Sequence, residues 1–173
     1  MPDRPAFILI WGVSGAGKSQ YCKWLAGRGY IYIDNDSVWQ REQQGTATVL
    51  EQQWTRIRRG QATTREFVDA IGAQKVVAEF GARPDEGSLV QLRLLIELGA
   101  SAWWFDGDRV AARESWPARD VPVDPELWRI QMAWVDAAWP KIAEILRSRI
   151  VRTIGPGLAY LPEAQIDRMM FGD

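Results

Sequence analysis

The pattern Gly-x-x-x-x-Gly-Lys-Ser over Gly12–Ser19 restricts the fold of this chain more than any other feature of the sequence. It follows the apolar run Ala6–Trp11, which is typical of a strand buried on both faces of a parallel sheet. It opens a segment, Lys18–Ala26, whose apolar side chains recur on one helical face. A strand, a glycine-rich loop and a helix N-terminus in this order predict a phosphate-binding loop.

Each part of this loop has a chemical role toward a nucleotide. Glycines let backbone N–H groups turn inward around phosphate oxygens, and the helix N-terminus adds the positive end of its dipole. Lys18 is suited to neutralise the β- and γ-phosphates and Ser19 to ligate Mg²⁺, so we expect ATP and Mg²⁺ as cofactors. The alternative is a glycine-rich turn with an exposed lysine. The residues expected to bind the nucleotide are Gly12, Ser14, Gly15, Ala16, Gly17, Lys18 and Ser19.

Strands and helices keep alternating beyond this loop. Further strands are expected at 30–33, 75–80, 101–105 and 149–154, and helices at 85–98 and 162–171. A stripe of apolar residues at three- and four-residue steps over 128–146 predicts a long helix that Pro140 kinks or splits. We therefore expect an α/β fold, a three-layer sandwich with a parallel five-stranded sheet flanked by helices, as one domain over residues 1–173.

Two segments are expected to cover the site. The polar stretch 36–60 and a helix that begins at the capping box Thr63–Glu66 predict a helical cap over about 36–73. Residues at about 107–123 are expected to form a lid. Both segments follow strands, at the edge of the sheet where ligands of α/β proteins bind.

Composition limits the partners and the chemistry. A net charge of -1, from 21 basic and 22 acidic residues, gives no overall attraction to nucleic acid or to anionic membranes. The absence of histidine leaves acid and base catalysis to carboxylates. Cys22 is the single cysteine and has no internal disulfide partner, and 1–5 lacks a secretory pattern, so we expect a cytoplasmic protein. No apolar run approaches the roughly 20 residues of a membrane span. Most of the ten tryptophans are expected in the core.

Carboxylates follow three of the expected strands. Asp34 and Asp36 come directly after the second strand, where the loop faces the γ-phosphate, and one of them is suited to take a proton from an acceptor hydroxyl. The alternative is that one caps the next helix. The second metal-side carboxylate is either Glu79 or Asp106, with a preference for Glu79; a helix cap is an equally ordinary role for Asp106.

The order strand, P-loop, helix and Asp-x-Asp resembles the small P-loop kinases, including gluconate kinase, shikimate kinase and the polynucleotide kinase group. The resemblance covers 6–36 and implies that Asp34 and Asp36 help to hold Mg²⁺ and to activate the acceptor hydroxyl. By the order in which they leave the strand, Asp36 is expected as the base and Asp34 on the metal side, with Ser19 and Glu79.

This chain departs from each of these families in one place. Gluconate kinases tend to carry a histidine after the acidic pair, and this chain has none. Shikimate kinases carry a run of glycines at the third strand, where this sequence has 77–80, Val-Ala-Glu-Phe. Polynucleotide kinases tend to carry an arginine three positions after the catalytic aspartate, where this chain has Trp39, although Arg41 is close.

Two groups of cations are candidates for binding phosphate or acceptor. Arg113 and Arg119 resemble the lid arginines of P-loop kinases, whereas Arg109 fits a solvated helix face equally well. The cap carries positive charge beside aromatic rings, which could hold an acceptor phosphate or stack a base. The alternative is a charged surface helix with Trp54 and Ile57 buried. The substrate candidates are Trp39, Arg41, Trp54, Arg58 and Arg59, with Arg56 and Arg65 beside them.

We therefore expect an ATP-dependent phosphotransferase that acts on a hydroxyl. The tryptophan- and arginine-rich cap favours a nucleotide, a nucleic-acid end or a modified base in DNA as the acceptor. A small sugar acid or polyol is the alternative, supported by the near-neutral charge and the short loop. A non-kinase ATP-binding switch is the second alternative, and the acidic pair argues against it.

Overall fold

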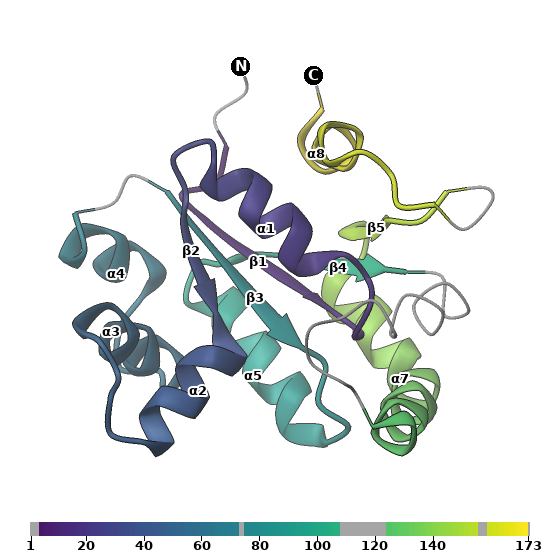
Figure 1. The fold of residues 1–173 in the computed structure, drawn as a ribbon, viewed down its shortest axis with the longest axis horizontal. Coiled ribbons are helices and arrows are strands. Elements are labelled where there is room, and N and C mark those ends of the chain that lie inside the picture. Colours follow the sequence, from purple (N-terminus) through teal and green to yellow (C-terminus); the bar gives the residue numbers. More distant parts are fainter. Residues whose placement is uncertain (1–3, 73–74, 108–123, 156–158, 173) are drawn as a thin grey trace.

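The computed structural model describes residues 4–72, 75–107, 124–155 and 159–172. Five parallel strands form one sheet in the order β2-β3-β1-β4-β5 (Figure 1). The strands are β1 (Phe7–Gly12), β2 (Ile31–Asp34), β3 (Val76–Gly81), β4 (Ser101–Asp106) and β5 (Ile150–Arg152). β1 lies at the centre of the sheet, so the loop after it opens between the carboxyl ends of β3 and β4. The predicted five-stranded parallel sheet is confirmed.

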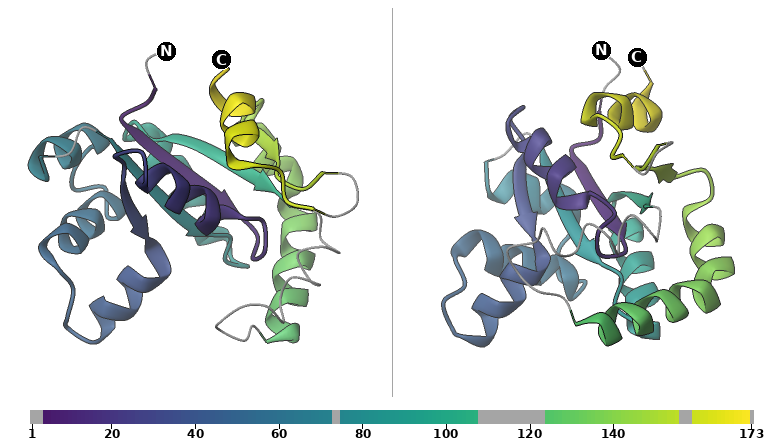
Figure 2. Two further views of the ribbon diagram at one scale, coloured as in Figure 1. Left: turned by 45° about the horizontal axis from the view of Figure 1, so that its top comes forward. Right: turned by 45° about the vertical axis from the view of Figure 1, so that its right-hand side comes forward.

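Helices cover both faces of the sheet and extend beyond its β2 edge. α1 and α8 lie on one face, α5 and α7 lie on the other, and α2, α3 and α4 form the cap beside β2 (Figures 1 and 2). The α/β sandwich with a helical cap is therefore present. The helices are α1 (Lys18–Ala26), α2 (Asn35–Gln43), α3 (Val49–Arg58), α4 (Thr64–Ala70), α5 (Glu86–Glu97), α7 (Pro125–Leu146) and α8 (Glu163–Phe171).

Side-chain caps set where the cap helices begin. Thr63 accepts a hydrogen bond from the N–H of Glu66, whose carboxylate accepts one from the N–H of Thr63, which confirms the predicted capping box. Thr48 and Glu51 form a second capping box that the sequence analysis did not identify. It divides the predicted helical stretch 36–60 into α2 and α3.

The core lies on both faces of the sheet and contains the predicted strand residues. β1 is buried at all six positions, as expected for the central strand of a parallel sheet. Trp11, Trp54 and Trp104 are at most 1% exposed, and Trp11 packs edge-on against Trp104 with ring centroids 5.0 Å apart. Among the described tryptophans, Trp39 is 43% exposed and the others are at least partly buried.

Pro140 bends the long helix without ending it. α7 is one helix over its 22 residues, with Pro140 inside it, so of the two predicted effects of this proline, a kink or a split, the split does not occur. The right view of Figure 2 shows the helix changing direction along its length, as expected where proline removes a backbone donor. Within the described part of the chain, no helix combines the length and apolarity that crossing a bilayer requires.

Candidate active site

The glycine-rich loop has the backbone conformation that its sequence predicts. Gly12, Gly15 and Gly17 have φ angles of 153°, 83° and 78°, which residues with a side chain rarely adopt. A Cβ on Gly12 would lie 2.6 Å from the carbonyl oxygen of Phe105, so β4 also excludes a side chain there. The strand, loop and helix therefore fit together only with glycine at these positions.

Two side chains from distant elements contact the loop from the outside. The Tyr160 hydroxyl donates a hydrogen bond to the carbonyl oxygen of Gly15. A Cβ on Gly17 would lie 3.2 Å from the Tyr160 ring, so the ring packs on the loop. On the α7 side, Oε1 of Gln131 accepts a hydrogen bond from the Ser14 N–H at 3.1 Å. Neither residue belongs to the sequence motif, and the sequence analysis missed both.

Lys18 and Ser19 begin α1 where the motif places them. The Lys18 ammonium group donates a hydrogen bond to the carbonyl oxygen of Val13 at 2.8 Å, so it lies across the loop. The Ser19 hydroxyl donates one to Oε1 of Glu79 at 3.0 Å. This second contact joins the start of α1 to β3, which pairs directly with β1.

Glu79 is a buried carboxylate that lies beside the Ser19 and Tyr32 hydroxyls. It is 9% exposed, and among the described atoms its Oε2 has no hydrogen-bond partner. Burial raises the pKa of Glu79, while the Lys18 charge and the Ser19 and Tyr32 hydroxyls oppose that shift. Glu79 and its neighbours raise the pKa of the Tyr32 hydroxyl further, after burial itself. A buried acid of this kind is stabilised by a cation placed beside it.

The residues present fit a Mg²⁺ ion. Ser19 supplies a hydroxyl oxygen, and Oε2 of Glu79 supplies a carboxylate oxygen, both of which this hard cation prefers. No group of three or more acidic, histidine or cysteine side chains suited to a metal occurs among the described residues. Mg²⁺ commonly has few protein ligands because nucleotide phosphates and water complete its shell.

The competing carboxylate Asp106 lies on the other side of β1. β4 pairs with β1 on the side opposite β3, and Asp106 is the last residue of that strand. The hydrogen bond from Ser19 goes to Glu79. This geometry agrees with the preference for Glu79 over Asp106, although the metal-binding role itself stays a prediction.

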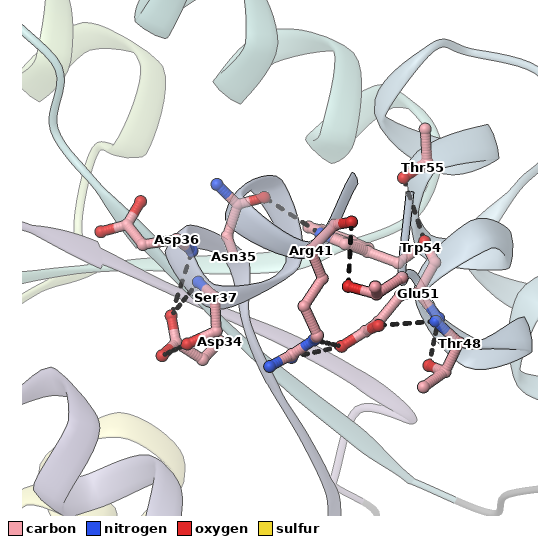
Figure 3. A network of polar contacts seen from close by, with 10 residues as sticks. Asp34, Asn35, Asp36, Ser37, Arg41, Thr48, Glu51, Trp54 and Thr55 are labelled. Atoms are coloured by element: carbon pink, nitrogen blue, oxygen red, sulfur yellow. Dashed lines mark hydrogen bonds and ion pairs between the residues drawn. The ribbon is translucent and has the colours of Figure 1, made fainter. Parts of the chain in front are cut away.

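Asp34 has the capping role that the sequence analysis left as its alternative. Its Oδ1 accepts hydrogen bonds from the backbone N–H groups of Asp36 and Ser37, and its Oδ2 accepts one from the Ser37 hydroxyl at 2.6 Å. These contacts begin α2 directly after β2 (Figure 3). Both oxygens are thus engaged, and a metal-side role for Asp34 has less structural support than one for Glu79.

Asp36 presents its carboxylate to the loop side of the sheet. A Cβ on Gly81 would lie 3.7 Å from Oδ2 of Asp36, so this carboxylate sits over the end of β3. Gly81 pairs in register with Gly12, the first residue of the P-loop motif. Asp36 is exposed and points away from the Arg41–Glu51 pair of the cap (Figure 3). This position fits the predicted base.

A small cavity lies at the start of α2, where Asn35, the chain neighbour of Asp36, forms part of its wall. It has a volume of about 140 Å³, and its walls come from the start of α2, the end of α3, the exit of β3 and the first turns of α5. A larger cavity of about 730 Å³ lies near the beginning of β1, at the opposite end of the strands from the P-loop. The smaller cavity therefore has the better position for an acceptor. It is lined by Asn35, Arg58, Phe80, Arg83, Asp85, Gly87, Ser88 and Gln91.

Most of the predicted substrate residues of the cap are held in contacts within it. Trp54 is fully buried, donates a hydrogen bond to Asn35 at 3.1 Å and stacks on Phe7, so it is not available to stack on a base. Arg41 pairs with Glu51 (Figure 3). The structure thus agrees with the alternative that Trp54 and Ile57 are buried.

The remaining cap candidates are divided among three places. Arg58 pairs with Glu42 at 2.6 Å and also lines the small cavity, where its Nε is buried with no hydrogen bond to the described residues. Trp39 lies under the guanidinium of Arg83, 5.4 Å from the ring centroid. Arg59 lines a separate cavity between α2 and α3. The Arg65 side chain lies at the opposite end of the sheet.

The predicted lid lies almost entirely outside the described residues. This applies to Arg113 and Arg119, the predicted lid arginines, and to Arg109. Gly107, at the start of the predicted segment, packs against the P-loop, since a Cβ there would lie 2.9 Å from the Cα of Ala16. The roles of these arginines stay predictions.

Comparison with solved structures finds kinases of similar fold. A gluconokinase from Sinorhizobium meliloti 1021 superposes with a TM-score of 0.54 at 21% identity, over 96% of this chain and 90% of that one. A sugar kinase from Janibacter sp. HTCC2649 gives 0.54 at 16% identity, over 94% and 90%. A shikimate kinase from Acinetobacter baumannii, in complex with shikimate, gives 0.52 at 14% identity, over 95% and 92%.

Sequence comparisons add nothing to this likeness. No protein-family model matches the chain, and no curated protein matches it in sequence. The similarity is therefore one of fold, over nearly the full length of each protein. The chain has the α/β fold of the small P-loop kinases.

Proposed function

We propose that this protein is an ATP-dependent kinase for a small anionic acceptor, of the sugar-acid class. The observation that carries the proposal is a cavity lined by two arginines, Arg58 and Arg83, and by Asn35, the chain neighbour of Asp36. A carboxylate on the acceptor would satisfy the unpaired Nε of Arg58 and meet the exposed Arg83. An acceptor hydroxyl would then lie near Asp36.

The size of the cavity limits the acceptor to a small molecule or to one end of it. A volume of about 140 Å³ is below the roughly 300–1,000 Å³ of typical ligand pockets, so only part of an acceptor such as a sugar acid would enter it. The nucleic-acid acceptor that the sequence favoured first lacks comparable support, because Trp54 is buried and Arg41 is paired with a carboxylate of the cap. The kinases of like fold are described as a gluconokinase, a sugar kinase and a shikimate kinase. The sugar-acid alternative therefore fits better than the original preference.

The reaction follows from the proposed roles of the chain's own residues. The acceptor oxygen bonds to the γ-phosphorus, the bond from that phosphorus to the β–γ bridging oxygen breaks, and the acceptor proton moves to the Asp36 carboxylate. Lys18 and the loop N–H groups stabilise charge on the phosphates. Ser19 and Glu79 would hold Mg²⁺, which when bound neutralises charge on the β- and γ-phosphates. The products are ADP and a phosphate ester.

Incubation with γ-labelled ATP and Mg²⁺ tests the proposal. The acceptor panel contains sugar acids such as D-gluconate, the matched neutral polyols, nucleosides and single-stranded oligonucleotides. Label transferred to a sugar acid is the expected result. Label on an oligonucleotide would restore the first preference of the sequence analysis, and release of phosphate alone would favour the ATP-binding switch.

The single, buried Cys22 remains consistent with a cytoplasmic location, which fractionation of the source cells would test.

A further inference from the structure

Gln131 joins the P-loop to the strand exit that leads into the small cavity. It projects from α7, and its amide bridges the backbone groups of Ser14 and Ala82, which are far apart in sequence. Its Oε1 accepts from the Ser14 N–H at 3.1 Å, and its Nε2 donates to the carbonyl oxygen of Ala82. The two partners fix the orientation of the amide, because the opposite orientation would face donor to donor and acceptor to acceptor.

Both ends of this bridge matter to the proposed reaction. Ser14 belongs to the loop that is expected to hold the phosphates, and Ala82 directly precedes Arg83 of the acceptor cavity. The N–H of Ala82 also donates to the carbonyl oxygen of Gly12 at 3.1 Å, which continues the pairing of β1 with β3 by one residue. Gln131 adds a contact beyond this ladder, from a helix outside the sheet, and ties Ser14 in the loop to the strand exit.

We propose that Gln131 is a positioning residue that sets the distance between the γ-phosphate and the acceptor hydroxyl. The inference rests on the proposed function. Phosphoryl transfer depends on alignment of the attacking and leaving oxygens, and a misplacement of about 1 Å lowers such rates by about 100-fold. Without the bridge, the P-loop still binds nucleotide, but its register with the acceptor cavity is no longer fixed.

Three substitutions separate the two hydrogen bonds. Gln131→Met keeps a similar length and removes both bonds. Gln131→Glu keeps an acceptor for the Ser14 N–H but replaces the donor to Ala82 with an oxygen. The matched control is Gln52→Met, since Gln52 is an exposed glutamine on α3 whose amide donates to the carbonyl oxygen of Ala47. Each variant is compared with the wild type by thermal melting.

The assay measures phosphate transfer to D-gluconate, the KM for ATP, and ATP hydrolysis without acceptor. For Gln131→Met we expect transfer kcat to fall about 100-fold, a KM for ATP within about threefold of wild type, and hydrolysis nearly unchanged. The transfer kcat of Gln131→Glu is expected to lie between those of Gln131→Met and the wild type, and that of Gln52→Met is expected to match the wild type. If Gln131→Met does not fold, Gln131→Glu decides by the same ratio of transfer to hydrolysis.

The outcomes distinguish this inference from the proposed function. An unchanged ratio of transfer to hydrolysis in a folded Gln131 variant overturns the positioning role alone, whether both activities are retained or both fall by the same factor. A wild-type protein that transfers phosphate to no sugar acid overturns the proposed function, and this inference with it.

Discussion

The Ser19 hydroxyl and Oε1 of Glu79 are hydrogen-bonded at 3.0 Å, so the first turn of α1 is tied to the strand beside β1. This contact points Glu79 at the residue that the P-loop motif assigns to Mg²⁺. Because Oε2 of Glu79 has no partner among the described atoms, the pair has an oxygen available for the ion or its bound water.

Glu79→Gln is expected to lower the affinity for Mg²⁺ more than the affinity for ATP. The amide keeps the volume and the contact with Ser19 but removes the negative charge, and loss of such a partner commonly costs 10- to 100-fold in metal affinity or activity. A titration of transfer rate against Mg²⁺ should shift to higher concentration, with partial rescue at saturation. The exposed Glu126→Gln is the control. An unshifted Mg²⁺ titration would move the metal-side role to another carboxylate.

Lys18→Ala should fold normally and lose at least about 100-fold in transfer, because its ammonium lies across the phosphate loop. Lys23→Ala is the matched control, since Lys23 is an exposed lysine of the same helix. Circular dichroism checks the fold of both variants. Turnover at the wild-type rate in Lys18→Ala would refute the P-loop assignment.

Asp36 and Asp34 should respond to substitution in different ways. Asp36→Asn is predicted to keep ATP affinity and to lose transfer by about 10²- to 10⁴-fold, as expected for a general base. Asp34→Ala should lower the free energy of unfolding by about 1 kcal/mol, because it removes the N-cap of α2. Asp34→Asn, which still caps, is expected to restore most of that stability. Normal transfer in Asp36→Asn would place the base elsewhere.

The sequence predicted the site wherever the chemistry is carried by neighbours in the chain. Glycine spacing after a buried strand indicated the P-loop, and the loop has the expected backbone. Contacts from distant elements left no such pattern: Gln131 is one polar residue on an amphipathic helix, and Tyr160 one aromatic after a short strand. The same limit explains why Trp54 was a candidate for substrate binding. The neighbouring arginines suggested an exposed binding surface, but Trp54 stacks on Phe7 and donates a hydrogen bond to Asn35, both distant in sequence.

Stability of the cap should depend on pH through Glu51. Its pKa is lowered below 4.5, first by the hydrogen bond from Arg41, and the N–H and hydroxyl of Thr48 add to the shift. A lowered carboxyl pKa contributes stability that is present above about pH 4.5 and is lost as the pH falls through the folded-state pKa. The loss of unfolding free energy in Glu51→Gln should therefore be largest near neutral pH and shrink in acid.

Urea unfolding of wild type, Glu51→Gln, Arg41→Gln and the double variant measures this effect. At neutral pH the two single variants should not be additive, because each removes the same ion pair. If Glu51→Gln lowers the free energy of unfolding equally at neutral and acid pH, the charge of the Glu51 carboxylate contributes nothing to stability.

Arg83→Gln should impair use of acidic acceptors and spare neutral ones. Arg83 lines the small cavity at the start of α2, and a charge-assisted hydrogen bond to a carboxylate contributes about 1.5–3 kcal/mol, or about 10- to 100-fold in affinity. The KM for D-gluconate should rise by that factor, whereas the KM for sorbitol, which lacks the carboxylate, should change little. Arg59→Gln, in the separate cavity between α2 and α3, is the control for the sugar-acid reading. The same variant tests the hypothesis of a nucleic-acid acceptor. If Arg59 contacts a backbone phosphate, oligonucleotide affinity should fall as salt rises, and the slope of log affinity against log salt concentration should be smaller by about 0.7 in the variant. An equal rise in KM for gluconate and sorbitol would show that Arg83 shapes the cavity without recognising charge. An oligonucleotide affinity that falls with salt, with a smaller slope in Arg59→Gln, would instead support a nucleic-acid acceptor.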